Sequence, residues 1–293
     1  MTAEGYGRTL WSPDDKTRRN ARITRYMAWL REAHDLAFSD YDALWHWSVT
    51  DLPAFWSSIW DYFEVLGDRG DSPVLSGGPM PAVRWFDGAT LNYARNALRT
   101  AWTDPGRTAL IAVSESERRA PHVLSYADLA SEVGRVARGL RSLGVRRGDR
   151  VAALLPNVAE AVVAMLAAAS IGAIWSSCSP DFGARSVIDR FAQIEPSVLI
   201  ACDGYTYNGK QFGRAEMVSQ VLTALPSGCA LVQVELLGTG LPGAVRWDEL
   251  GASAEPGDTA PEFEEMPFEH PLWVVYSSGT TGLPKPIMHG HGG

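Results

Sequence analysis

The 293-residue sequence has few cysteines and a shortage of positive charge, and each shortage excludes a class of protein. Its three cysteines, Cys178, Cys202 and Cys229, lie far apart and follow no metal-ligand spacing, so neither a disulfide framework nor a zinc site is indicated. Such cysteine usage favours a reducing, cytoplasmic setting. The net charge of −8 argues against nucleic acid or an anionic membrane as a partner.

Long apolar runs are absent as well. The most apolar stretch, residues 161–175, is too short to span a bilayer. A cluster of charges at Asp14, Asp15, Lys16, Arg18 and Arg19 comes too early for the apolar region of a secretory leader. The sequence is 46% hydrophobic and 20% charged, which is typical of a globular protein. It holds eleven tryptophans, most of them before residue 103, so the first third of the chain has its own character.

This uneven composition predicts two domains, the first being a Trp-rich helical lobe with a linker over residues 1–100. Apolar spacing predicts one helix over residues 17–36. Asp51 as N-cap, with Pro53 behind it, predicts the start of another helix that runs to Gly67. We interpret the tryptophans as core packing, with a ligand platform as the alternative. The other expected segments are a helical turn and extended link at 40–49, a linker at 67–88 and a helix at 89–101.

The second predicted domain, residues 101–293, alternates short apolar strands with amphipathic helices. This alternation predicts an α/β fold, a mainly parallel sheet with flanking helices. Ser125 and Asp128 form a capping-box pattern at the start of one helix. Ligands of such sheets bind at the carboxyl ends of the strands. The predicted strands are 109–113, 122–124, 151–155, 173–176, 198–201, 231–236 and 272–276, and three further helices are predicted at 157–172, 183–194 and 211–225.

The last predicted strand runs into a loop rich in glycine and hydroxyl side chains. Glycines let the backbone approach a ligand closely, and successive N–H groups form a concave anion site. Hydroxyl and ammonium donors suit phosphate oxygens. The spacing is not that of a Walker A loop. We therefore predict a phosphate-binding loop, with a solvated surface loop as the alternative. Its candidate residues are Ser277, Ser278, Gly279, Thr280, Thr281, Gly282 and Lys285.

The order Ser-Ser-Gly-Thr-Thr-Gly-x-Pro-Lys after a buried strand resembles the phosphate loop of the adenylate-forming enzymes. Residues 148–173 are similar to the first subdomain of the acyl-CoA synthetases, and residues 85–94 are similar to their acetyl-CoA synthetase branch. Within that branch, residues 40–49, residues 55–63 and Pro286 are similar to the acetoacetyl-CoA synthetases. The resemblance covers most of the chain.

The resemblance implies an acid–thiol ligase with acetoacetate, ATP, Mg²⁺ and CoA as substrates. Acetoacetate would attack the α-phosphorus of ATP to give acetoacetyl-AMP and pyrophosphate, and the CoA thiolate would then displace AMP. The loop would hold the β- and γ-phosphates. The CoA-binding segments of the family map onto residues 179–182 and 207–210, which makes Ser179, Phe182, Asn208 and Lys210 candidate CoA contacts. Acetyl-CoA synthetases carry arginines in the second segment; here Lys210 and Arg214 are the nearest cations.

The family's adenine, ribose and C-terminal lysine segments do not occur in this sequence. No catalytic residue or metal ligand is therefore assigned. We expect the N-terminal part of a longer enzyme, completed by a missing C-terminal region or a complementary chain, which alone forms no acyl-adenylate. The alternatives are a non-catalytic nucleotide- or phosphate-binding module acting with a partner chain, a ligase for another short-chain acid, and an inert remnant that self-associates through an exposed apolar face. Acyl specificity and oligomeric state stay open.

Three further patterns are interpreted as structural. Residues 238–243 match Gly-x-Gly-x-x-Gly, but Pro242 and the lack of a following amphipathic helix predict a loop, not a dinucleotide site. Asp181 and Arg185 are interpreted as a helix cap and solvated charges, with a catalytic role as the alternative. Three histidines without metal-ligand spacing are expected to cluster near the phosphate loop: His270, His289 and His291.

Overall fold

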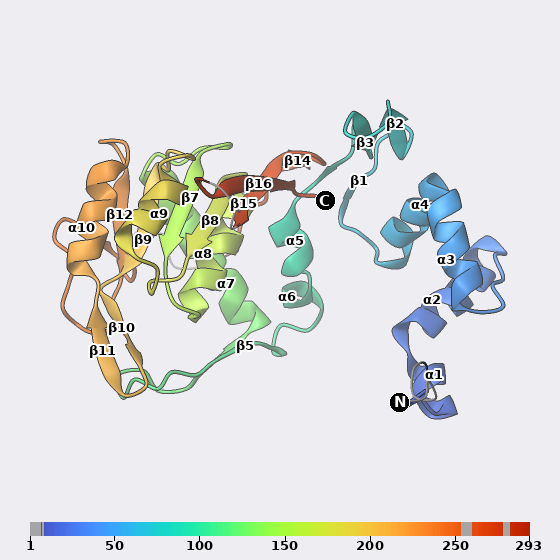
Figure 1. Ribbon diagram of the computed structural model, residues 1–293, viewed down its shortest axis with the longest axis horizontal. Coiled ribbons are helices and arrows are strands. Elements are labelled where there is room, and N and C mark those ends of the chain that lie inside the picture. Colours follow the sequence, from blue (N-terminus) through green and yellow to red (C-terminus); the bar gives the residue numbers. More distant parts are fainter. Residues whose placement is uncertain (1–6, 8, 253–259, 278–281) are drawn as a thin grey trace, which may run out of the picture. The chain divides into compact units, whose positions relative to one another are not determined.

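The structure is a computed structural model that describes residues 7, 9–252, 260–277 and 282–293. The chain forms two compact units (Figure 1). Unit 1 comprises Met1–Val65 and Ser72–Asp87, and unit 2 comprises Leu66–Asp71 and Gly88–Gly293. The domain division expected at residue 100 stays a prediction. Within the described ranges, no helix combines the length and apolar content needed to cross a membrane.

Unit 1 is built mainly from four short helices, and aspartates cap three of them, α1, α3 and α4. They are α1 (Asp15–Asn20), α2 (Arg22–His34), α3 (Tyr41–Thr50) and α4 (Leu52–Tyr62). The predicted N-cap Asp51 is confirmed, because its carboxylate accepts the Ala54 N–H. Asp40 caps α3 in the same way, so residues 41–50 are helical throughout and the expected extended link is wrong. The helix expected over 17–36 is broken at Ala21, whose backbone is extended.

Aromatic side chains pack the core of unit 1, although some tryptophans stay at the surface. Tyr26 meets Tyr62 with ring centroids 5.0 Å apart, and Trp47 meets Phe55 at 5.7 Å. Trp45, in contrast, is 54% exposed. The core-packing interpretation therefore holds for part of the tryptophan set. In the segment expected to be a linker, β2 (Leu75–Gly77) pairs antiparallel with β3 (Val83–Trp85).

Unit 2 begins with small elements where one helix was expected over 89–101. Strands β1 (Gly67–Asp68), β4 (Thr90–Leu91) and β14 (Met266–Pro267) form a three-stranded sheet, and α5 (Tyr93–Ala97) and α6 (Thr100–Thr103) follow β4. Gly67 thus lies in a strand and does not end α4, which stops at Tyr62. Asn92 causes the break between strand and helix. Its buried side chain accepts the N–H groups of Ala94 and Arg95 and so starts α5.

A seven-stranded sheet forms the centre of unit 2 (Figure 1), in the order β13-β12-β9-β7-β8-β15-β16. Every neighbouring pair is parallel except β15 with β16, so the predicted α/β fold with a mainly parallel sheet is confirmed. The strands are β7 (Arg150–Leu154), β8 (Ile174–Cys178), β9 (Val198–Cys202), β12 (Ala230–Val234), β13 (Val245–Arg246), β15 (Pro271–Ser277) and β16 (Lys285–Gly290).

Helices cover both faces of this sheet, because side chains alternate along a strand. In β7, Val151 and Ala153 belong to one apolar cluster, and Ala152 and Leu154 belong to another. The first cluster includes α7 (Tyr126–Ser142) and α8 (Ala159–Ser170), and the second includes α9 (Ala184–Phe191) and α10 (Ala215–Ala224). The predicted capping box at the start of α7 is present.

Two antiparallel pairs complete unit 2. Strand β5 (Thr108–Ala112) pairs with β6 (His122–Ser125), as expected. Strand β10 (Gly204–Tyr207) pairs with β11 (Lys210–Gly213) where the sequence predicted the start of a helix. The turn between them, Asn208-Gly209, has φ of 50° and 70°. Asn-Gly between two strands is the strongest short-range signal for a β-hairpin. This dipeptide therefore predicts the hairpin, whereas the apolar spacing that follows it predicted a helix.

Candidate functional site

The carboxyl ends of the parallel strands meet at one edge of the sheet and border a cavity of about 550 Å³. The segments that follow β7, β8 and β12 supply residues 156–158, 179–181 and Leu236. The loop between β5 and β6 supplies residues 113–116 and Arg119, and β10 supplies residues 205–207. The lining mixes polar side chains with Val113, Pro156, Val158, Pro180 and Leu236, so this edge suits a ligand that has both polar and apolar groups.

The predicted phosphate loop joins two antiparallel strands at this edge. Ser277 is the last residue of β15 and lies directly opposite Lys285, the first residue of β16. Side chains of directly opposed residues project from the same face of a sheet. The partly buried hydroxyl and the exposed ammonium therefore share one side of the loop base. Gly282 has φ of 101°. The other predicted loop residues, Ser278, Gly279, Thr280 and Thr281, lie outside the described residues.

Helix α9 and the residues that follow it hold both ends of the loop. Gln193 donates from Nε2 to the Pro284 carbonyl at 3.0 Å. Tyr276 donates its hydroxyl to the Arg190 carbonyl at 2.8 Å. Burial raises the pKa of the Tyr276 phenol to about 12, so it stays a neutral donor. The Arg190 guanidinium lies 5.1 Å from the ring centre of Phe182, one of the predicted CoA contacts. No sequence pattern indicated these contacts, because they join residues far apart in the chain.

The two segments predicted to contact CoA line the same cavity, and Arg214 ties the first of them to strand β10, which leads into the second. Its Nε donates to the Pro180 carbonyl at 2.5 Å, beside Ser179, and its Nη2 donates to the Tyr205 hydroxyl at 2.9 Å. The same guanidinium lies over the Tyr205 ring at 4.9 Å. Arg214, one of the two cations nearest the second segment, is therefore held as a structural tie. Lys210 is exposed at the end of the hairpin turn.

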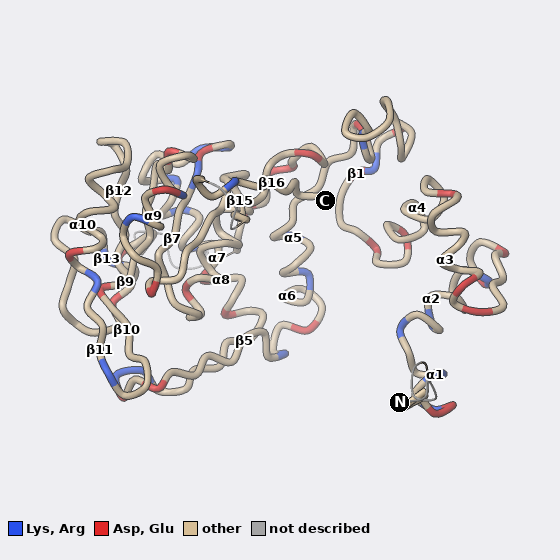
Figure 2. The backbone as a smooth tube through the Cα atoms, viewed as in Figure 1, with Lys and Arg blue, Asp and Glu red and all other residues tan. Residues whose placement is uncertain are grey.

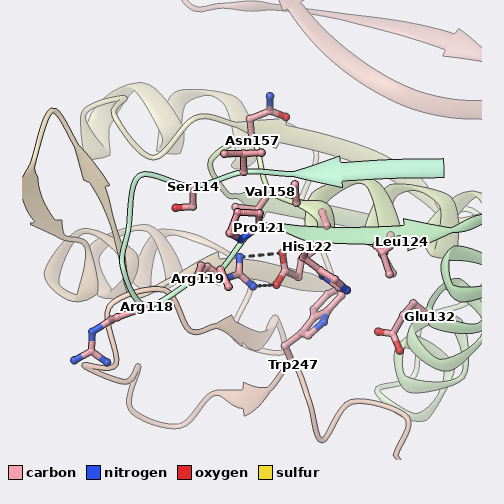
Figure 3. A pocket seen from close by; sticks show the side chains of 16 residues that line it. Ser114, Arg118, Arg119, Pro121, His122, Leu124, Glu132, Asn157, Val158 and Trp247 are labelled. Atoms are coloured by element: carbon pink, nitrogen blue, oxygen red, sulfur yellow. Dashed lines mark hydrogen bonds and ion pairs between the residues drawn. The ribbon is translucent and has the colours of Figure 1, made fainter. Parts of the chain in front are cut away.

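The loop between β5 and β6 is held at two places. The Glu115 carboxylate accepts the backbone N–H groups of Asn208 and Gly209, at 2.9 and 3.1 Å. Arg119 forms a two-point ion pair with Glu160 in the first turn of α8, marked by the dashed lines at Arg119 in Figure 3. A second cavity of about 460 Å³ lies beside this ion pair. No sequence pattern indicated a role for Glu115 or Arg119, because neither residue belongs to a local motif.

The Gly-x-Gly-x-x-Gly stretch is a loop, as predicted, and a buried carboxylate organises it. Asp203 follows β9 and is fully buried. It accepts the backbone N–H groups of Leu236, Leu237 and Thr239 at 2.7–3.2 Å. Burial favours a higher pKa for this carboxyl, but the N–H donors outweigh it and hold the pKa below its ordinary value. These donors are committed to Asp203, so they are not free to bind a pyrophosphate.

The expected histidine cluster lies at the wrong end of β15. Pro271 pairs with Gly290 at the amino end of the strand, six residues and roughly 20 Å from Ser277. The rings of His270 and His291 lie there, 5.7 Å apart. Burial, followed by the charges of His270 and Arg147, lowers the pKa of His291 to about 4, so its ring is neutral. In the described part of the chain, no three His, Cys, Asp or Glu side chains group as metal ligands do.

Asp181 and Arg185, the two charged residues singled out after β8, are both exposed. Arg185 pairs with Asp189 at 2.8 Å on the surface of α9. Gly183 occupies the N-cap position of α9, and no side chain caps that helix, so the cap expected from Asp181 is wrong. Asp181 instead accepts the Ser179 hydroxyl within the cavity wall.

Comparisons with known proteins agree with this geometry. Residues 98–293 match the family model described as "AMP-binding enzyme", and residues 41–97 match "Acetyl-coenzyme A synthetase N-terminus". The acetoacetyl-coenzyme A synthetase of Rhizobium meliloti (strain 1021) is 39% identical over 98% of this chain and 44% of that protein. That of Rattus norvegicus is 40% identical over 97% of this chain and 43% of that protein.

The solved structure of acetoacetyl-CoA synthetase from Streptomyces lividans superposes with a TM-score of 0.90 at 47% identity, over 98% of this chain and 44% of that one. The chain thus spans less than half the length of these relatives. The resemblance to acetoacetyl-CoA synthetases predicted from the motifs is confirmed. Because one family model matches most of its residues, the chain belongs to the AMP-binding enzyme family.

Proposed function

We propose that this chain supplies the ATP-phosphate and CoA-facing parts of an acid–thiol ligase that makes acetoacetyl-CoA from acetoacetate, ATP and CoA. The observation that carries the proposal is the placement of Ser277 and Lys285, which project from one face at the carboxyl edge of the sheet. The relatives' names support acetoacetate as the acid. The ammonium and hydroxyl would stabilise charge on the leaving pyrophosphate, which is the main protein contribution to such transfers.

CoA would approach along the cavity between the segment after β8 and the β10–β11 hairpin. Ser179 lies in the wall of this cavity. Phe182 is 39% exposed, and Asn208 and Lys210 stand at the exposed hairpin turn. The Ser179, Asp181 and Asn157 side chains offer polar contacts within the cavity wall. Mg²⁺ would enter with the ATP phosphates, since ATP-dependent sites usually bind it through substrate oxygens and water.

Lys285 provides the test of phosphate binding. We expect Lys285→Ala to weaken Mg-ATP binding by about 10- to 100-fold, because a hydrogen bond to a charged group is worth roughly 1.5–3 kcal/mol. Titration calorimetry of the purified chain measures this. Lys210→Ala removes the same charge at the hairpin and should leave ATP binding unchanged. Equal ATP affinity in the wild type and in Lys285→Ala would contradict the proposed role of the loop.

The reaction itself is tested by acetoacetate-dependent exchange of labelled pyrophosphate into ATP. Exchange by this chain alone would show that it forms the acyl-adenylate unaided. ATP binding without exchange would mean that the chain supplies the phosphate-binding part of the enzyme but does not form the acyl-adenylate alone. If another short-chain acid supported faster exchange than acetoacetate, that acid would be the substrate in place of acetoacetate. A cytoplasmic setting is also proposed, on the ground that Cys178, Cys202 and Cys229 are free thiols.

A further inference from the structure

The turn of the β10–β11 hairpin has the form of an anion-binding site. Tyr207 pairs with Lys210, which leaves Asn208 and Gly209 as a two-residue turn, with φ of 50° and 70°. In a turn with two positive φ values, the N–H groups of the central residues are not used by the strand pairing. Two adjacent N–H groups that the strand pairing does not use, beside a lysine, suit a negatively charged oxygen group.

The present occupant of this site is a carboxylate of the same chain. Each oxygen of Glu115 accepts one of the two N–H groups, at 2.9 Å from Asn208 and 3.1 Å from Gly209. In Figure 2 acidic and basic residues meet where the loop after β5 reaches the tip of the hairpin. The turn therefore binds an anion with two-point geometry, and the anion is internal. Glu115, Asn208, Gly209 and Lys210 are all exposed, so a ligand in solution has access to the contact.

The Glu115 contact closes one side of the cavity at the carboxyl edge. Ser114, Glu115 and Ser116 form part of the cavity wall, as do Tyr205 and Tyr207 of the hairpin. The other anchor of the loop, Arg119 with Glu160, lies on α8 and is independent of the hairpin. Releasing Glu115 would thus free the outer part of the loop while its inner part stays attached.

We propose that Glu115 is a carboxylate latch on a phosphate-binding turn, and that a phosphate group of CoA displaces it. The proposal rests on the proposed function for the identity of the ligand. The Arg214 guanidinium is committed to Pro180, Gly213 and Tyr205, which leaves Lys210 as the cation next to the turn. Glu115 satisfies the two N–H groups in the absence of ligand, so an incoming phosphate must replace an existing anion.

The test compares Glu115→Gln with Glu117→Gln. Glu117 is an exposed residue of the same loop, and its substitution removes the same charge. The probes are CoA, adenosine 3′,5′-bisphosphate and dephospho-CoA, titrated calorimetrically into the purified chain. We expect Glu115→Gln to bind CoA and the bisphosphate about fivefold more tightly, because a unit charge about 4 Å away in water-like surroundings amounts to roughly that factor.

Glu117→Gln should match the wild type, and Lys210→Ala should bind more weakly. A gain for CoA but not for dephospho-CoA assigns the turn to the 3′-phosphate, and an equal gain for both assigns it to the diphosphate.

Several outcomes overturn the latch. They are an equal gain in Glu115→Gln and Glu117→Gln, an unchanged or lower affinity in Glu115→Gln, and no binding of any of the three probes. Amide resonances of Asn208 and Gly209 supply a direct readout, since the bisphosphate should move them in the wild type as Glu115→Gln does. Mg-ATP titration of the same proteins separates the two proposals. ATP binding that depends on Lys285, together with a failed latch, leaves the proposed function intact.

Discussion

At the scale of single residues, Asp203 and Arg214 show that a sequence pattern does not reveal the hydrogen-bond partners of a charged side chain. Asp203 follows an apolar strand and looks like an ordinary strand-end aspartate, yet it is fully buried and accepts three backbone N–H groups from the loop after β12. Arg214 looks like a free cation and is a tie between two segments. In both cases the residue type was visible, but its partner depended on a segment brought close by the sheet.

Replacing Asp203 by asparagine should lower the free energy of unfolding at pH 7 by about 2–4 kcal/mol, because N–H donors lose a charged acceptor in a buried place. The folded-state pKa of Asp203 lies below its ordinary value of 3.8. Its stabilisation is therefore complete above that value and is lost as the pH falls through 3.8 towards the folded pKa. Urea unfolding between pH 7 and pH 2 measures both effects.

The exposed Glu216 on α10 provides the control. Glu216→Gln also removes one negative charge and should change the unfolding free energy by less than about 0.5 kcal/mol. If Asp203→Asn kept the full acid dependence of the wild type, Asp203 would not be the group that titrates.

At the scale of elements, local signals were reliable where they are self-contained. The capping box of Ser125 and Asp128 and the cap at Asp51 satisfy N–H groups within their own helices, so three or four residues suffice to recognise them. The helix predicted over residues 211–225 began too early and took in residues 211–213 of β11, because the apolar spacing after Gln211 resembles a helical face. Helix α7 contains a further packing constraint, at Gly139.

Gly139 should be intolerant of alanine although it lies inside a helix. A Cβ at this position would overlap the Leu250 side chain and approach the Gly251 nitrogen to 2.9 Å. We expect Gly139→Ala to destabilise the fold by about 1–3 kcal/mol, whereas the same change at an open helical site stabilises by about 1 kcal/mol. Thermal and urea unfolding measure the change.

The double variant Gly139→Ala with Leu250→Ala gives the internal control. Removing most of the Leu250 side chain makes room for the new methyl group, so the double variant should lose less stability than the sum of the two single variants. Strict additivity would show that the cost at Gly139 does not come from this contact.

At the scale of the whole molecule, residues just before the α/β region belong to its core. Asn92 is fully buried and donates to the carbonyls of Ala169, Ser170 and Glu264 at 2.9–3.1 Å. Leu98 is fully buried in the same apolar cluster as α8. Unit 2 accordingly includes residues 88–100, and the Trp-rich composition that suggested a division at residue 100 does not report these contacts.

Truncation tests this division. We expect the fragment 66–293 to keep cooperative thermal unfolding and the fragment 101–293 to lose it, since the second lacks β1, β4, α5 and the Asn92 hydrogen bonds. Circular dichroism measures both. In the full chain, Asn92→Ala should cost about 2–4 kcal/mol through unpaired buried carbonyls. Equal stability of the two fragments would support a boundary at residue 100.

The sequence by itself determined the alternation of strands and helices, the helix caps at Asp51 and Ser125, and a loop rich in glycine and hydroxyl side chains after a buried strand, because each depends on residues close together in the chain. The tertiary structure alone decided which loops meet. Strand β15 pairs with β8, about 100 residues earlier, and Glu115 meets a hairpin turn about 93 residues later. It also placed His270 and His291 at the far end of β15. The order of strands in a sheet is set by how helices pack on its two faces, and local patterns carry no record of that packing.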